Sequence, residues 1–354
     1  MQLLSFFSKI GDVWSAVWPY LVAVLAILFM IFIHEFGHFI AAKLMGVRVN
    51  EFAIGFGPTL FKKQGKETLY SVRLLPFGGF CAMEGEDEES GDTKAFCNKK
   101  AWRRLIIIVA GAFMNLVFGL LLVMCTLAPA DRYITTTVHS FHEENAMSCQ
   151  SGLMAGDKIV EVNGRSIYSI NDLSYCLSNV EGDTLAMTVE RNGEDVPLNV
   201  KFNAETQDGI NYVDVDFYLD TEDKTVGSFL RQSFTRTVSY GRVVWFSLVD
   251  LITGKYGISA ISGPVGVTGA IATVAKTGLL DLLPIVALIT INLGIFNLLP
   301  IPALDGGRAF FLLVEMIIRR PIPKKFEGMV HGIGLILLLL FMAFITVKDI
   351  WGFF

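Results

Sequence analysis

Four long apolar stretches divide the chain into alternating apolar and polar parts. They lie at about residues 18–44, 105–127, 279–299 and 330–347, and each is long enough to cross a bilayer, which takes roughly 20 apolar residues. Between the second and third stretches, short alternating runs and Asn-Gly turns are typical of strands. We therefore predict an α-helical polytopic membrane protein with four transmembrane helices, a membrane-associated β-loop and an inserted extracytoplasmic α+β domain.

The distribution of charge predicts the orientation of these spans. Residues 43–104 contain eleven Lys and Arg against eight acids, whereas residues 131–281 contain eleven against twenty. Because cytoplasmic loops are enriched in Lys and Arg, we expect the first loop in the cytoplasm and the second outside, with both termini also extracytoplasmic. With 53% hydrophobic residues and a net charge of -5, the expected partner is the lipid bilayer, and no nucleic acid is expected.

The same pattern divides the chain into seven segments. They are a first transmembrane helix (1–46), a cytoplasmic or membrane-reentrant β-loop region (47–103), a second transmembrane helix (104–128), an extracytoplasmic domain (129–205), an amphipathic linker or helix region (206–278), a third transmembrane helix with a cytoplasmic loop (279–329) and a fourth transmembrane helix (330–354).

The first apolar stretch contains the motif His34-Glu35-Phe36-Gly37-His38. In a helix the two histidines lie one turn apart on the same face, where they can bind one zinc ion, and Glu35 is then placed to act as a general base. A rise of 1.5 Å per residue puts His34 about 24 Å from Trp18, in the cytoplasmic half of the bilayer. The alternative is a polar pair at a helix contact. An ionisable group in a span costs on the order of 3 kcal/mol, however, which favours a functional site.

A tetrahedral catalytic zinc site needs a third protein ligand and one open position. Asp305 is the only carboxylate in the stretch 297–307, and its expected depth near the inner interface matches that of the histidines. Pro300 and Pro302 interrupt helical hydrogen bonding there, so the freed backbone can pair with an extended substrate. The alternative is that Asp305 caps the next helix near Arg308.

The second apolar stretch contains Gly111 and, one helical turn later, Asn115. A small residue allows close helix approach, and an amide allows one hydrogen bond between helices. Packing alone and a role for Asn115 in binding substrate or transition state both remain open.

The segment 50–83 alternates and is rich in glycine, and its Gly78 and Gly79 are candidate substrate-binding residues. This pattern predicts short strands and turns. Because the segment is too apolar for a free loop, we expect a β-hairpin that dips toward the membrane, where exposed backbone is tolerated only if paired or packed. An ordinary surface hairpin is the alternative.

The extracytoplasmic segment contains a tight turn, an alternating strand and an Asn-Gly turn within residues 151–164, followed by helical and strand patterns up to residue 202. This part resembles a PDZ domain of the bacterial protease type, and such domains bind extended peptide ends by strand addition. His139 and His142 lie at its edge and are not expected to bind metal. After it, residues 226–255 show helical spacing of apolar positions, which predicts an amphipathic helix at the outer membrane surface or packed on the bundle.

Together these features resemble the site-2 protease family of intramembrane zinc metalloproteases, and most closely its bacterial regulator-of-sigma-E branch. The resemblance covers essentially the whole chain and rests on the intervening PDZ-like domain and two motifs, His34-Glu35-x-x-His38 and Asn297-x-x-Pro300-x-Pro302-x-Leu304-Asp305-Gly306.

The resemblance implies Zn²⁺ bound by His34, His38 and Asp305, with Glu35 as the catalytic base. It also implies a substrate-binding role for Asn297, a membrane-reentrant β-loop at residues 55–83, and location in the bacterial cytoplasmic (inner) membrane. The implied substrates are single-span membrane proteins, such as anti-sigma factors or remnant signal peptides, in regulated intramembrane proteolysis.

The chain departs from the proteobacterial pattern because it has one PDZ-like module instead of two, so a single-PDZ form is expected. Two other classes of function were weighed. A silent membrane scaffold is disfavoured by the intact Glu35 and ligand set. A transporter with broken helices is disfavoured because four spans are too few for a usual pair of repeats and because the sequence has no internal repeats.

Overall fold

The computed structural model describes residues 2–352 except 87, 89, 179, 181, 208–209 and 258–260. The chain forms two compact units. The first consists of Met1–Gly119 and Gly254–Phe354, and the second of Leu120–Thr253.

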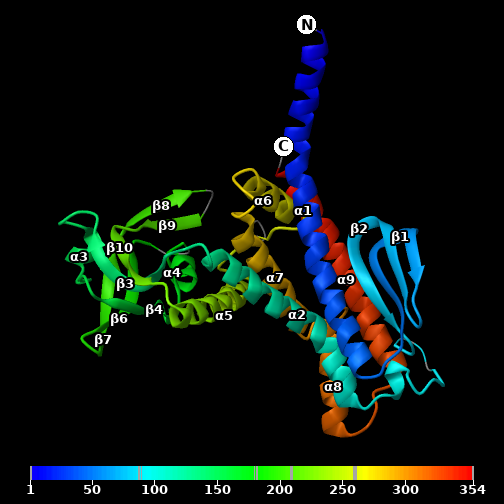
Figure 1. Cartoon of the computed structure of the whole chain (residues 1–354). Coiled ribbons are helices and arrows are strands. Elements are labelled where there is room, and N and C mark those ends of the chain that lie inside the picture. Colours follow the sequence, from blue (N-terminus) through cyan, green and yellow to red (C-terminus); the bar gives the residue numbers. More distant parts are fainter. Residues whose placement is uncertain are drawn as a thin grey trace. The chain divides into compact units, whose positions relative to one another are not determined.

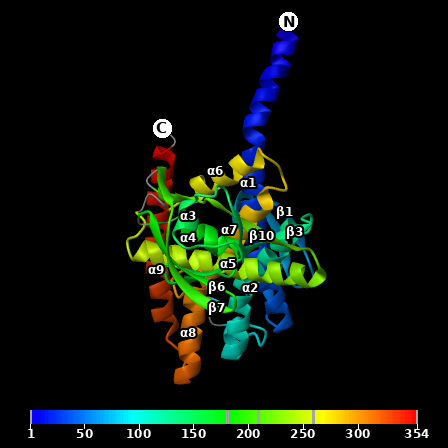
Figure 2. The same cartoon turned by 90° about the vertical axis from the view of Figure 1, so that its left-hand side faces the viewer.

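The first unit is mainly helical. Its helices are α1 (Gln2–Leu44), the larger part of α2 (Ala101–Leu127), α6 (Pro264–Ala275), α7 (Leu282–Leu298), α8 (Asp305–Ile318) and α9 (Lys324–Trp351), with a short 3₁₀ helix η1 (Phe96–Asn98) before α2. The N-terminal part of α1 projects beyond the other helices of its unit (Figure 1). Figure 2 shows the same projection after a turn of 90°.

Three described helices are long and apolar enough to cross a membrane, namely residues Gly11–Leu44 of α1, α2 and α9. The expected third span is also helical, but α7 has 17 residues, fewer than the roughly 20 that a crossing takes. The expected cytoplasmic loop after it contains a further helix, α8. The coarse architecture is therefore that of a polytopic membrane protein with an inserted β-rich region.

Helix α1 ends where a glycine follows it. Gly46 has φ of 70°, a left-handed conformation that glycine adopts without steric cost. The amide of Val47 then donates a hydrogen bond to Ala42 O at 2.8 Å, as in a Schellman motif. This cap turns the chain into the strands that follow.

The segment after α1 forms two long strands, β1 (Val49–Gln64) and β2 (Leu69–Met83), which pair antiparallel and lie beside α1 (Figure 1). Phe52 lies opposite both Tyr70 and Cys81, because the strands bend and pair more than once. Gly55, with φ of 84°, is one such bend, and a Cβ there would lie 2.6 Å from Leu75 O. The sequence pattern for 50–83 therefore did predict strands and turns.

The hydrophobic core of this unit joins the end of α1 to α2, the start of the β1–β2 hairpin and α8. Its buried members include Ala42, Val49, Phe52, Ile107 and Leu312. This core holds the C-terminal part of α1 against α2 and α8. These three helices form the site described below.

The second unit is built on a six-stranded sheet in the order β10-β3-β4-β6-β7, with β5 paired to β4. Its strands are β3 (Arg132–Phe141), β4 (Lys158–Val162), β5 (Arg165–Ser166), β6 (Thr184–Arg191), β7 (Glu194–Lys201) and β10 (Phe217–Asp223), and it also contains α3 (Met147–Gln150), α4 (Ile170–Leu177) and a separate β8 (Asn203–Gln207)–β9 (Ile210–Asp214) hairpin.

The β6–β7 turn is Asn192-Gly193, and both residues have positive φ, as a type I′ turn requires. By contrast, β10 pairs with β3 at the far end of the sheet. The sheet therefore includes a strand beyond the expected domain boundary at residue 205.

The long helix α5 (Val226–Ile252) packs against this sheet domain. Asp250, which is 3% exposed, accepts hydrogen bonds from Tyr175 Oη at 2.8 Å and from both terminal nitrogens of Arg165. About two turns earlier on α5, Arg242 donates to Ser166 O at 2.6 Å and pairs with the buried Asp172. A helix is therefore present where the sequence predicts an amphipathic one, and its polar residues bind the sheet domain. Its position at the outer membrane surface or on the bundle stays a prediction.

Candidate metal centre

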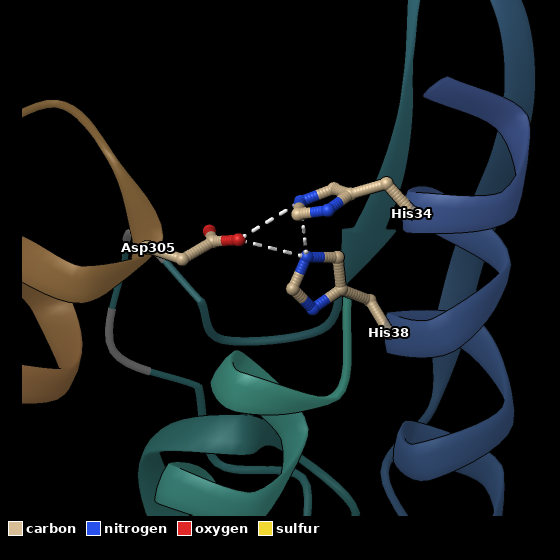
Figure 3. Close-up of side chains that lie close together, drawn as sticks. All are labelled: His34, His38 and Asp305. Atoms are coloured by element: carbon tan, nitrogen blue, oxygen red, sulfur yellow. Dashed lines mark hydrogen bonds and ion pairs between the residues drawn. The ribbon is translucent and has the colours of Figure 1, made fainter. Parts of the chain in front are cut away.

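Three side chains that could bind a metal converge between α1 and α8. His34 and His38 extend from one face of α1, and Asp305, the first residue of α8, points at both of them (Figure 3). Asp305 Oδ2 lies 2.9 Å from His34 Nε2 and 3.2 Å from His38 Nε2, and the two Nε2 atoms are 3.2 Å apart. Among the described residues, this is the one cluster of at least three such ligands close enough to share an ion.

The three distances among these nitrogen and oxygen atoms fit a metal ion with short metal–ligand bonds. Ligand atoms around a tetrahedral zinc ion, with bonds of 2.0–2.2 Å, lie roughly 3.3 Å apart. The observed spacing is close to this value, and the donor set of two imidazole nitrogens and one carboxylate oxygen is one that zinc prefers in catalytic sites. The residues present therefore fit a zinc ion.

The outward-facing nitrogens of both histidines have partners. His38 Nδ1 donates a hydrogen bond to Ile107 O at 2.8 Å, which fixes the tautomer and leaves the Nε2 lone pair free. The Asn115 amide lies 3.3 Å from His34 Nδ1. Its Oδ1 is buried without another partner among the described residues, so rotating the amide by half a turn lets Oδ1 accept the His34 Nδ1 proton.

Asn115 comes from α2 and is fully buried. The sequence left two roles open for Asn115. Its buried position disfavours a contact with substrate, because the side chain faces His34 and has no exposed surface. The position instead suits a residue that orients the His34 ring through its Nδ1 atom, on the side away from Asp305.

Glycines set the distance between α1 and α2. A Cβ at Gly111 would overlap the His38 ring, and a Cβ at Gly37 would overlap Ala110 O. The small residue noted in the sequence is thus needed for close packing. Because the His38 ring packs directly against Gly111, the packing of the two helices also fixes the position of this ring.

The loop between α7 and α8 positions Asp305. Leu304 occupies the N-cap position of α8, so Asp305 is not the cap that the alternative interpretation proposed, and Arg308 pairs with Glu86 instead. Ala303 has φ of 77°, which is uncommon for a residue with a side chain. Its amide donates a hydrogen bond to His331 Nδ1 at 3.0 Å.

His331 is a residue that the sequence analysis missed. The signal was available, because His331 is an ionisable side chain in the fourth apolar stretch, and such residues are usually functional. The sequence does not predict the hydrogen bond between His331 and Ala303, which lies 28 positions earlier in the chain.

A cavity of about 250 Å³ lies beside the three side chains, and only some of the predicted substrate residues line it. Glu35, Asn297 and Asp305 line it together with His34. Gly79 lies behind Glu35, where a Cβ would be 3.4 Å from Glu35 Cγ. Two residues are not among those that line the cavity: Pro300, which is exposed, and Gly78, which packs against the Phe56 ring.

The chain is similar to known proteins over most of its length. Residues 22–341 match peptidase family M50. A Clostridium acetobutylicum protein named "Putative zinc metalloprotease" is 35% identical over 93% of this chain and 96% of its own length. The zinc metalloprotease RasP of Geobacillus kaustophilus is 30% identical over 92% of this chain and 96% of its own.

A third relative, the regulator of sigma-W protease RasP of Bacillus subtilis, is 29% identical over 92% of this chain and 96% of its own length. The match to the family extends over most of the chain, including both parts of the metal centre. The chain therefore belongs to peptidase family M50, the family of site-2 proteases.

Proposed function

We propose that this protein is an intramembrane zinc metalloprotease that hydrolyses peptide bonds within the transmembrane segments of single-span proteins. The observation that carries the proposal is the convergence of His34, His38 and Asp305 at one point, with Glu35 lining the same cavity. The names of the relatives support zinc as the metal.

Each residue of the centre has a distinct role in this proposal. His34, His38 and Asp305 hold the zinc ion, which when bound supplies a Lewis acid that polarises a carbonyl group and acidifies water. The Glu35 carboxylate takes a proton from water and transfers it to the leaving amine. Ile107 O and the Asn115 amide hold the two imidazoles in the orientation that directs Nε2 toward Asp305.

The substrate must be extended at the bond that is cut, because the amides of a helix are covered by neighbouring turns. The part of β2 from Gly79 to Met83 pairs with β1 along one edge, and no described strand pairs with its other edge. A substrate strand added there, next to Glu35, would meet Asn297 across the cavity. Gly78 permits the bend before this edge, and the Pro300 carbonyl, which has no helical partner, is a further acceptor.

The membrane topology follows from the charges of the loops. We propose four crossings, with α7 and the loop after it as the third, and with the termini and the sheet domain outside the bacterial cytoplasmic membrane. The sheet domain acts as a single PDZ module for peptide ends. The relative named for sigma-W regulation supports an anti-sigma factor as one substrate, and remnant signal peptides have the same single-span form.

The test uses the full-length protein in proteoliposomes, with a single-span substrate already trimmed on its outer side. We expect cleavage within the span by the unaltered protein, with one zinc per chain. Glu35→Gln should abolish cleavage and retain zinc, whereas Asp305→Asn should lose zinc. Glu88→Gln, at an exposed loop position, is the matched control and should cleave normally.

Cleavage retained in Glu35→Gln would overturn the role of the base. Full zinc content in Asp305→Asn would overturn the ligand set. Peptide capture without cleavage by the unaltered protein would instead indicate the scaffold, and zinc-independent uptake of a solute would indicate the transporter.

A further inference from the structure

A second cavity, of about 460 Å³, lies between α1 and the β1–β2 hairpin. On the helix side it is lined by Phe32, Phe36 and Phe39, which recur at helical spacing. At 100° per residue, these rings fall on the face of α1 opposite to His34 and His38. The cavity is therefore separate from the metal centre.

The hairpin side of this cavity is also apolar, with Phe52, Ile54 and Val72 among its lining residues. Its volume is within the range of roughly 300–1,000 Å³ that small-molecule sites have. Because most of its lining residues are apolar, the cavity suits a hydrocarbon chain.

The two ends of the hairpin differ in polarity. Large apolar side chains are exposed on the part away from the turn, including Phe56, Leu60, Leu74 and Leu75. The 65–68 turn is instead tied to the end of α1, because Lys43 pairs with Glu67 at 2.6 Å. An apolar exterior at one end and ion pairs at the other are what a hairpin at a membrane interface requires.

The mouth of the cavity, near this turn, contains Lys62 and Lys63. Both side chains are exposed, and neither forms an ion pair with a described carboxylate. Lys43 and Lys94, by contrast, both form ion pairs with Glu67. Two free cations beside an apolar cavity complement a ligand with a negative headgroup and a hydrocarbon tail.

We propose that this cavity binds one acyl chain of an anionic phospholipid, whose phosphate pairs with Lys62 and Lys63. The lipid fills the space between α1 and the hairpin and so limits the motion of β2. This strand contains Gly79, which lies next to the Glu35 side chain. The inference requires the hairpin to lie at the membrane, but it does not depend on proteolytic activity.

The first experiment measures lipid binding to the full-length protein purified from vesicles of equimolar phosphatidylglycerol and phosphatidylcholine. Native mass spectrometry should find phosphatidylglycerol enriched on the unaltered protein. Lys62→Gln with Lys63→Gln should lower that enrichment by about fivefold per lysine removed. Lys324→Gln with Lys325→Gln, another adjacent exposed pair, is the matched control and should leave it unchanged. Equal losses in both variants, or no preference for phosphatidylglycerol, would overturn the proposal.

The second experiment locates the acyl chain with phosphatidylglycerol that carries a diazirine in its tail. Crosslinks should map to residues 32–39 and 52–72. Val72→Trp, which fills the cavity, should reduce them several-fold, whereas Leu74→Trp, exposed on the same strand but outside the lining, should not. Crosslinks spread evenly over α2 and α9 would contradict a defined site. Capture of a peptide instead of lipid by a photoreactive side chain at Val72 would assign the cavity to a protein partner.

Discussion

The amide of Ala303 donates a hydrogen bond to Nδ1 of His331, and this contact ties the loop before Asp305 to helix α9. The helix lies close to the loop beyond this bond as well, since a Cβ at Gly334 would overlap Pro302. Ala303 holds a left-handed conformation that costs on the order of 1–3 kcal/mol and persists only where the surroundings impose it. Helix α9 imposes it, although it contributes no ligand.

Replacing His331 should therefore weaken metal binding at a distance. His331→Ala removes the acceptor, and we expect zinc affinity to fall roughly tenfold or more, as for other outer partners of metal ligands. His331→Asn, whose side-chain oxygen can accept the same bond, should restore much of the loss. Competition with a fluorescent chelator measures the affinity, and His139→Ala in the sheet domain is the control. If the Ala and Asn variants behave alike, a role through this hydrogen bond is refuted.

Adding one methyl group at Gly111 should also disrupt the centre. The new Cβ in Gly111→Ala would overlap the His38 ring, so either the ring or helix α2 must move. We expect substantial loss of zinc and of cleavage, with the helical content of the protein preserved by circular dichroism. Gly332→Ala is the matched control, because this helical glycine in α9 has open space around it. Normal zinc content in Gly111→Ala would show that the contact is not needed.

The two roles considered for Asn115 predict different kinetics. If its amide orients His34, Asn115→Ala should lower zinc affinity roughly 10–100-fold, and Asn115→Asp, which keeps an acceptor, should be milder. If the amide instead binds substrate, Asn115→Ala should raise KM and leave zinc affinity unchanged. We expect the first result, from chelator competition and cleavage kinetics on the same preparations.

The attachment of the hairpin turn to α1 should depend on pH. The ammonium groups of Lys43 and Lys94 hold the pKa of Glu67 below its usual value. A depressed carboxyl pKa stabilises the folded arrangement at neutral pH, and the effect is lost as the pH falls through the folded pKa. A spin label at residue 66 should therefore gain mobility only below pH 4.5, the ordinary pKa of this group.

Glu67→Gln should show the higher mobility already at pH 7, and Glu88→Gln should behave like the unaltered protein. An unchanged spectrum in Glu67→Gln would mean that other contacts hold the turn.

The local parts of this structure could be predicted from the sequence. The helical spacing of His34 and His38 requires only one turn of helix, and Asp305 stood out as the sole carboxylate of its stretch. The pairing of His331 with Ala303 and of β10 with β3 could not be predicted, because both join segments that no local pattern connects. Helix α8 was expected only in the alternative in which Asp305 caps it, since its charged flanks and the prolines before it are typical of a loop.

The proposed ligands of the metal centre come from distant parts of the chain, since His38 and Asp305 are 267 positions apart. During synthesis, a ribosome that has delivered α1, α2 and the whole sheet domain has produced only two of the three proposed ligands. The partly made protein cannot cut its neighbours at the site of membrane insertion, because the order of translation postpones its activity until nearly every helix is in place.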